Sequence, residues 1–171
     1  MRRNVAAVVG GSDGSAALLA EAEAVGRGLV DAGYRIATGG GSGVMEAASR
    51  GARRATAYRE GDVIAILPGV DAEAANAYAD IVLPTGLGHA RNGVLVCSAD
   101  VVVAIGGGAG TLSEIALAWV HGKPVICLDR GEGWSAELSG RALDARRGDA
   151  VLHRAEDADA VIRLARAVCP P

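Results

Sequence analysis

Three glycine-rich clusters recur at the same kind of place in the chain, between an apolar run and a helix-like run. They cover residues 10–14, 39–43 and 106–110. Each follows a short stretch rich in Val, Ile and Ala and precedes a segment with apolar residues at helical spacing. Strands that alternate with helices in this way predict βαβ units and a mostly parallel sheet. The expected fold class is α/β, a three-layer Rossmann-like fold with helices on both faces of the sheet.

The apolar patterning predicts the other elements around these clusters. Residues 70–79 look like an irregular connector, and glycines leave 130–148 ambiguous and without an assigned role. No composition break or repeat divides the chain, so we expect a single nucleotide-binding domain over residues 1–171. Strands are expected at 4–9, 34–38, 63–67, 80–83, 100–105, 125–128 and 150–153. Helices are expected at about 18–32, 42–55, 90–97, 111–121 and 158–168.

The composition excludes several classes of protein. The net charge is −3 and the chain has two Trp, three Tyr and no Phe, which argues against a nucleic-acid partner. The longest uncharged run, 101–113, contains four glycines and is too short to span a bilayer. The apolar run at 5–9 is too short for the core of a signal peptide. We therefore expect a cytoplasmic protein without a membrane partner.

Cysteine and lysine exclude further chemistry. The three cysteines are far apart and show no CxxC spacing, so we expect no metal site, and we expect Cys97 and Cys127 to be small core residues. The only lysine, Lys123, precedes Pro124 and does not follow a glycine loop as in a P-loop NTPase. It also falls at the edge of the sheet opposite the glycine loops, which excludes a pyridoxal-phosphate enzyme. No cofactor is expected, and lysine decarboxylation is excluded.

The glycine clusters predict a phosphate site. In a parallel sheet the loops after the strands share one edge, and a helix N-terminus reached through glycine offers free N–H groups to an anion. Tight strand-to-helix turns are the alternative explanation for any one cluster. The second strand ends in Thr38 without the acidic residue that would bind a ribose, which disfavours NAD. The expected ligand contacts are Gly11, Ser12, Gly40, Gly41, Ser42, Gly43, Gly107, Gly108, Gly110 and Thr111.

Three segments resemble the LOG (lonely guy) family, whose members are often mislabelled as lysine decarboxylases. The segments are 39–45 (GGGSGVM), 89–92 (HARN) and 106–114 (GGGAGTLSE). The resemblance implies hydrolysis of a nucleoside 5′-monophosphate to free base and ribose 5-phosphate, in a homodimer or higher homo-oligomer. It also implies that Glu114 is the catalytic carboxylate and that Arg91 holds the substrate near the reacting sugar.

The chain departs from the LOG pattern at two key positions and in one loop length. Gly106 replaces a proline, Asn92 replaces a lysine, and the loop at 39–45 is one residue shorter. These departures resemble a sister subgroup that includes molybdenum-cofactor carrier proteins. The alternative function is therefore a non-catalytic carrier that binds a phosphorylated pterin or nucleotide.

Glu114 and Arg91 also have simpler explanations. Thr111 and Glu114 have the spacing of a capping box, with Thr111 as the helix N-cap. In the first turn of a helix, Glu114 is expected to be ionised, suited to stabilising a ribosyl cation or activating water but not to acting as a general acid. Arg91 could be a solvated helix arginine. The predicted 111–121 helix has one charged residue, Glu114, so it needs burial on more than one side, in agreement with a homodimer.

Overall fold

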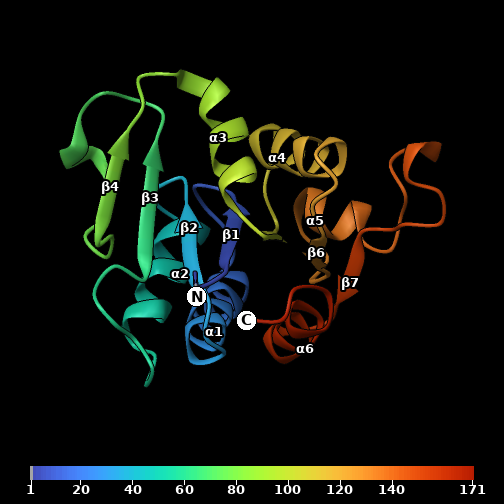
Figure 1. Cartoon of the computed structure of the whole chain (residues 1–171), viewed down its shortest axis with the longest axis horizontal. Helices are drawn as coiled ribbons and strands as arrows, with labels where there is room; N and C mark the ends of the chain where they lie inside the picture. The colour runs from blue at the N-terminus through green and yellow to red at the C-terminus, as the bar shows by residue number, and fades with distance from the viewer. Residues whose placement is uncertain (1) are drawn as a thin grey trace.

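The computed structural model describes residues 2–171 and contains one parallel sheet of seven strands. The strand order is β4-β3-β2-β1-β5-β6-β7, with β4 at one edge and β7 at the other (Figure 1). The chain runs outward from β1 to β4 and then returns to place β5 beside β1, so the order reverses between β1 and β5. The strands are β1 (Val5–Gly10), β2 (Arg35–Thr38), β3 (Val63–Leu67), β4 (Ile81–Pro84), β5 (Val101–Ile105), β6 (Val125–Leu128) and β7 (His153–Ala155).

Helices cover both faces of the sheet, which confirms the expected α/β three-layer fold (Figure 1). One core packs α1, α2 and α6 against alternate strand residues such as Ala6 and Val8. The other packs α3 and α4 against their neighbours Ala7 and Val9, because successive strand residues point to opposite faces. The helices are α1 (Ala16–Asp31), α2 (Val44–Arg53), α3 (Arg91–Ser98), α4 (Ala109–Val120), α5 (Gly133–Leu138) and α6 (Ala158–Val168). Short 3-10 turns lie at η1 (Ala72–Ala74), η2 (Gly88–Ala90) and η3 (Ala145–Arg147).

Three sequence-based expectations were wrong in detail. The last strand begins at His153 and not at 150, because Leu152 donates its backbone N–H to the Arg141 carbonyl and the pairing with β6 starts at His153. Helix α4 begins two residues earlier than expected, at Ala109. Cys97 is exposed, whereas Cys127 is buried as expected.

Segment 139–150 covers the C-terminal half of α4. The buried Trp119 donates its indole N–H to Asp144, at 2.9 Å. The Arg147 guanidinium lies 4.9 Å from the centre of the same ring. The apolar surface of α4 is therefore partly buried by its own chain, and the homodimer stays a prediction.

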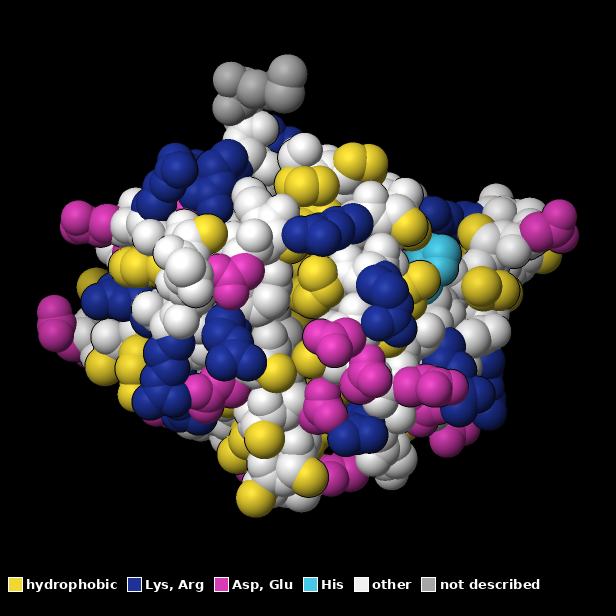
Figure 2. All heavy atoms as spheres, turned by 90° about the horizontal axis from the view of Figure 1, so that it is seen from below, with side chains coloured by type: hydrophobic (Ala, Val, Ile, Leu, Met, Phe, Trp, Pro, Cys, Tyr) yellow, Lys and Arg dark blue, Asp and Glu magenta, His cyan; other side chains and the backbone are white. Residues whose placement is uncertain are grey.

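Charged side chains of both signs share the surface. Figure 2 shows basic and acidic side chains interleaved over the face seen from below. Several of them are paired, as Arg54 is with Glu23 and Arg130 is with Glu21. Over residues 2–171, no helix combines the length and apolar character that crossing a membrane requires.

Candidate functional site

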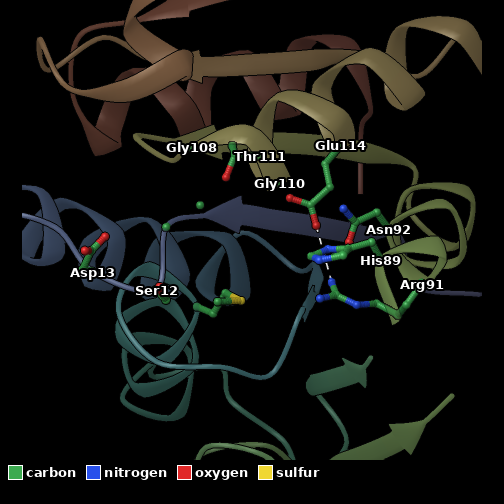
Figure 3. A pocket seen from close by; sticks show the side chains of 12 residues that line it. Ser12, Asp13, His89, Arg91, Asn92, Gly108, Gly110, Thr111 and Glu114 are labelled. Atoms are coloured by element: carbon green, nitrogen blue, oxygen red, sulfur yellow. Dashed lines mark hydrogen bonds and ion pairs between the residues drawn. The ribbon is translucent and has the colours of Figure 1, made fainter. Parts of the chain in front are cut away.

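A cavity of about 390 Å³ opens at the carboxyl ends of β1 and β5, where the strand order reverses. Gly10 pairs with Ile105, so the loops that follow these two residues leave the sheet side by side. This crevice is the usual ligand position in open α/β sheets. The cavity is lined by Gly10, Gly11, Ser12, Asp13, Met45, His89, Arg91, Asn92, Gly108, Gly110, Thr111 and Glu114 (Figure 3).

The N-terminus of α4 forms one wall of the cavity. Gly108 is its N-cap, and within residues 2–171 the helix has no side-chain cap. A Cβ atom added to Gly108 or Gly110 would meet nothing within 4 Å, so the approach to this turn is open. Free N–H groups at the positive end of a helix dipole bind anions. The first turn of α4 can therefore receive a phosphate.

Thr111 is not the N-cap that the capping-box pattern predicted. It is the third residue of α4, and its hydroxyl points toward the cavity (Figure 3). Gly107 has a φ of +85°, and a Cβ atom there would collide with the Thr111 hydroxyl. Gly107 does not itself line the cavity. Its lack of a side chain makes room for Thr111.

Glu114 and Arg91 meet at the opposite end of the cavity. The Arg91 Nη1 atom lies 3.4 Å from the Glu114 Oε1 atom (Figure 3). Burial raises the pKa of Glu114 to about 7, although the positive charge of Arg91 acts in the opposite direction. The expectation of a firmly ionised Glu114 was wrong, because the residue lies in the second turn of α4 and is buried. At neutral pH this carboxyl group can both donate and accept a proton.

Arg91 is largely buried and poorly paired. Its side chain is 12% exposed, and its Nε atom is buried without a hydrogen-bond partner. Burial lowers the pKa of Arg91, and Glu114 opposes that change. A Cβ atom on Gly39 would lie 2.7 Å from Nη1, so Gly39 leaves the space that the guanidinium occupies. Arg91 is thus a cavity residue and not a solvated helix arginine.

Asn92 is a neutral side chain at the position where the LOG pattern has lysine. It is 4% exposed, and its Nδ2 atom donates to the Ser113 hydroxyl at 2.8 Å. The contact ties α3 to α4 beside the cavity. The Ser113 hydroxyl in turn donates to the Gly110 carbonyl, at 2.7 Å. Asn92 therefore helps to place the first turn of α4.

The cluster at 39–43 contributes less directly to this cavity than the other two clusters. The structure brings Gly11, Ser12, Gly108, Gly110 and Thr111 together around it, but not the residues of this second cluster. The Ser42 hydroxyl donates to the Ser12 carbonyl at 2.9 Å, and Gly43 packs against the Ser12–Asp13 backbone. The cluster therefore supports the turn at Ser12. The four predicted ligand contacts in this cluster therefore do not line the cavity: Gly40, Gly41, Ser42 and Gly43.

Segment 132–135 supports the third glycine cluster from behind, a role that the sequence did not indicate. The Gly106 N–H donates to the Ser135 hydroxyl at 2.7 Å, and that hydroxyl donates to the Leu128 carbonyl at 2.8 Å. The Trp134 N–H donates to the Gly107 carbonyl at 3.0 Å. A Cβ atom on Gly133 would lie 2.5 Å from the Gly106 carbonyl carbon. The sequence does contain a signal that could have indicated this role, since Gly131 and Gly133 follow strand β6 at the same edge of the sheet.

Known proteins with related sequences and structures cover most of the chain. An uncharacterized protein of Archaeoglobus fulgidus is 43% identical over 104 residues, which is 61% of this chain and 66% of that protein. The molybdenum cofactor binding protein of Rippkaea orientalis is 35% identical, with a TM-score of 0.82 and 98% of both chains covered.

The molybdenum cofactor carrier protein of Chlamydomonas reinhardtii is 31% identical to this chain. Its TM-score is 0.82, and the match covers 99% of this chain and all of that one. The family model of the SLOG cluster4 family matches residues 3–162. The chain therefore belongs to the SLOG cluster4 family.

Proposed function

We propose that this protein binds a small phosphorylated pterin and acts as its carrier. The observation that carries the proposal is the open N-terminus of α4, which faces a cavity at the point where the strand order reverses. Gly108, Ala109 and Gly110 are exposed, and this turn has no side-chain cap, so its N–H groups are available to a ligand that supplies acceptor oxygens. A phosphate does so with its charge aligned to the helix dipole.

The proposed phosphate contacts come from two neighbouring loops. The first turn of α4 contributes N–H groups and the Thr111 hydroxyl, and the β1 loop contributes Gly11 and Ser12. The second cluster is assigned a supporting role, because Ser42 and Gly43 contact Ser12. Gly107 has a similar role, because its lack of a side chain makes room for Thr111. Arg91 lies at the far end of the cavity, where its free donors can reach a different part of the ligand.

The class of ligand is proposed from the relatives. The Rippkaea orientalis protein is described as binding molybdenum cofactor and the Chlamydomonas reinhardtii protein as carrying it, and both match this chain over at least 98% of its length. That cofactor is a pterin with a terminal phosphate. The neutral Asn92 at the lysine position of the LOG pattern also favours binding over hydrolysis.

A titration measured by calorimetry tests the proposal. Inorganic phosphate, 6-hydroxymethylpterin and its phosphate ester would each be added to the purified protein. We expect the phosphate ester to bind, inorganic phosphate to compete with it, and the alcohol to bind at least about tenfold more weakly, since a charge-assisted site contributes more than about 1.4 kcal/mol. Equal affinity for ester and alcohol, or no competition by phosphate, would contradict the proposal.

Hydrolysis of a nucleoside 5′-monophosphate is the second candidate function, and the Glu114–Arg91 pair favours it. With a pKa of about 7, Glu114 can take a proton from the attacking water, whose oxygen joins the sugar carbon as the N-glycosidic bond breaks, and then pass that proton to the departing base. Arg91 would hold the sugar oxygens.

Release of free base from AMP, GMP, CMP, UMP or IMP distinguishes the two functions. If the protein is a hydrolase, Glu114→Gln should lower turnover at least about a hundredfold, the scale seen when a preorganised electrostatic group is removed. Phosphate binding should persist in the variant, because Glu114 does not belong to the first turn of α4. A wild-type protein that releases no base from any of the five nucleotides would exclude hydrolysis of these substrates.

A further inference from the structure

We propose that a second cavity, behind Arg91, holds the flat heteroaromatic ring of the ligand whose phosphate lies at α4. This inference rests on the proposed phosphate site. The second cavity has a volume of about 360 Å³. It is lined by Gly39, Gly41, Met45, Leu67, Pro68, Gly69, Ala74 and Arg91. Two of these residues, Met45 and Arg91, also line the first cavity, so they form a shared wall.

The walls of the second cavity suit a flat apolar ring. Among the lining residues, Gly69 faces open space, where an added Cβ atom would meet nothing within 4 Å, and Leu67 and Pro68 add aliphatic surface. Met45 contributes a thioether, which packs favourably against aromatic rings. Ligand sites are mainly apolar with a few placed polar groups, and Arg91 is the charged residue of this cavity.

Hydrogen bonds hold the 70–79 connector, whose Ala74 lines the cavity, in place. Asn76 donates its backbone N–H to the Gly40 carbonyl at 2.8 Å and its side-chain Nδ2 to the Gly41 carbonyl at 3.1 Å. These bonds hold the 70–79 connector, with η1, against the second glycine cluster. The cavity is therefore built by tertiary hydrogen bonds and is not a gap in a loose loop.

Arg91 identifies the chemical class of the ring. Its guanidinium is planar, lies in the shared wall and forms an ion pair with Glu114, while its Nε atom is buried with no acceptor among residues 2–171. Arginine stacks on aromatic faces and donates to acceptors in its own plane. A bicyclic ring with carbonyl and ring-nitrogen acceptors, such as a pterin or a purine, meets both requirements. An aliphatic chain meets neither.

Blocking the second cavity separates ring binding from phosphate binding. Ala74→Phe fills it from η1, and Gly69→Phe fills it from the opposite wall, where a Cβ atom meets nothing within 4 Å. Ala72→Phe is the matched control, on the same exposed 3-10 turn but outside the cavity lining. The probes are ribose 5-phosphate, which lacks a ring, and GMP and 6-hydroxymethylpterin phosphate, which carry one.

In the wild type and in Ala72→Phe, we expect the ring-bearing probes to bind at least about tenfold more tightly than ribose 5-phosphate, the effect of one good stacking contact. In both blocking variants this advantage should vanish, while the affinity for ribose 5-phosphate stays within about twofold. An unchanged advantage in both variants would overturn the proposal and leave the phosphate site intact. If inorganic phosphate did not compete with these probes in the wild type, the proposed function, on which the ring site rests, would be overturned instead.

Discussion

The glycine clusters at 106–110 and 39–43 have similar sequences but different surroundings. Gly108 and Gly110 face open space in front of a helix N-terminus. In the second cluster, by contrast, the space at Gly39 is occupied by the Arg91 guanidinium, and Gly43 packs against the backbone of the β1 loop. Glycine thus leaves an open surface at one cluster and permits close packing within the chain at the other.

This difference shows why glycine content alone does not locate a binding site. Both clusters end a strand and begin a helix, and both lie at the carboxyl edge of the sheet. Only the cluster beside the reversal of strand order has its helix N-terminus open to the first cavity. The following experiments test the proposed division between an anion-binding cluster at 106–110 and a supporting cluster at 39–43.

The largest effect is expected for Gly108→Asp. The new carboxylate would itself cap α4, and a like charge about 4 Å from a bound phosphate costs roughly 4 kcal/mol at an effective dielectric of 20. We expect the affinity for inorganic phosphate to fall at least about a hundredfold while stability rises by up to about 1 kcal/mol from the cap. Calorimetry and thermal unfolding measure the two changes. Gly41→Asp in the second cluster is the control and should change the affinity for inorganic phosphate less than about threefold. If both variants lost the same affinity, the proposed division between the two clusters would be refuted.

Glu114→Gln should stabilise the protein in a pH-dependent manner. Burial raises the folded-state pKa of Glu114 from 4.5 to about 7, so its contribution to wild-type stability is fully present below pH 4.5 and is lost as the pH rises through about 7. At about 1.36 kcal/mol per pKa unit, the loss is about 3 kcal/mol. The variant, which cannot ionise there, should be more stable by this amount above pH 7 and equally stable at pH 4.5.

Urea unfolding of Glu114→Gln between pH 4.5 and 8 measures this difference. The exposed Glu137 on α5 supplies the control, Glu137→Gln. A constant difference between Glu114→Gln and the wild type at every pH would show that Glu114 is not a buried titrating group. If Glu114 acted only in a helix cap, Glu114→Gln would instead lower the stability by no more than about 1 kcal/mol.

Ser135→Ala tests the support behind the anion-binding cluster. It removes the partner of the buried Gly106 N–H and of the Leu128 carbonyl, and unsatisfied buried groups cost about 1–3 kcal/mol. We expect a loss of about 2 kcal/mol of stability together with weaker phosphate binding. Ser139→Ala is the control, because its buried hydroxyl has no partner and its removal should cost nothing. A loss of stability without any change in phosphate affinity would limit segment 132–135 to a structural role.

The smallest effect is expected for Gly39→Ala in the second cluster. The added methyl group would lie 2.7 Å from Arg91 Nη1 and displace the guanidinium. Since Arg91 lowers the pKa of Glu114, that pKa should rise further, with a change in stability of less than about 1 kcal/mol. Titration of the Glu114 carboxyl carbon by NMR measures the shift. Gly93→Ala, in open space on α3, is the control; the same pKa in both variants would mean that Gly39 does not position Arg91.

Local patterns predicted most of the fold. The apolar runs at 5–9 and 101–105 became central strands, because strands covered on both faces must be apolar throughout. The start of the last strand was missed because it depends on a hydrogen bond between Leu152 and the Arg141 carbonyl. The start of α4 was missed because its N-cap is Gly108, which has no capping side chain to recognise in the sequence. Segment 130–148 was ambiguous because its glycines break any local pattern. One of them, Gly133, packs against Gly106 and Gly107, which are far away in the sequence.

The sequence by itself determined the alternation of strands and helices, the family motifs and the sheet edge that carries the site. These follow from residue periodicity and from the rule that parallel strands end at one edge. Only the tertiary structure decided which glycines face a cavity, that Arg91 is buried between two cavities, and that Glu114 titrates near neutrality. The physical reason is that solvent exposure, and with it the cost of ionising a carboxyl group, depends on elements that are distant in the chain.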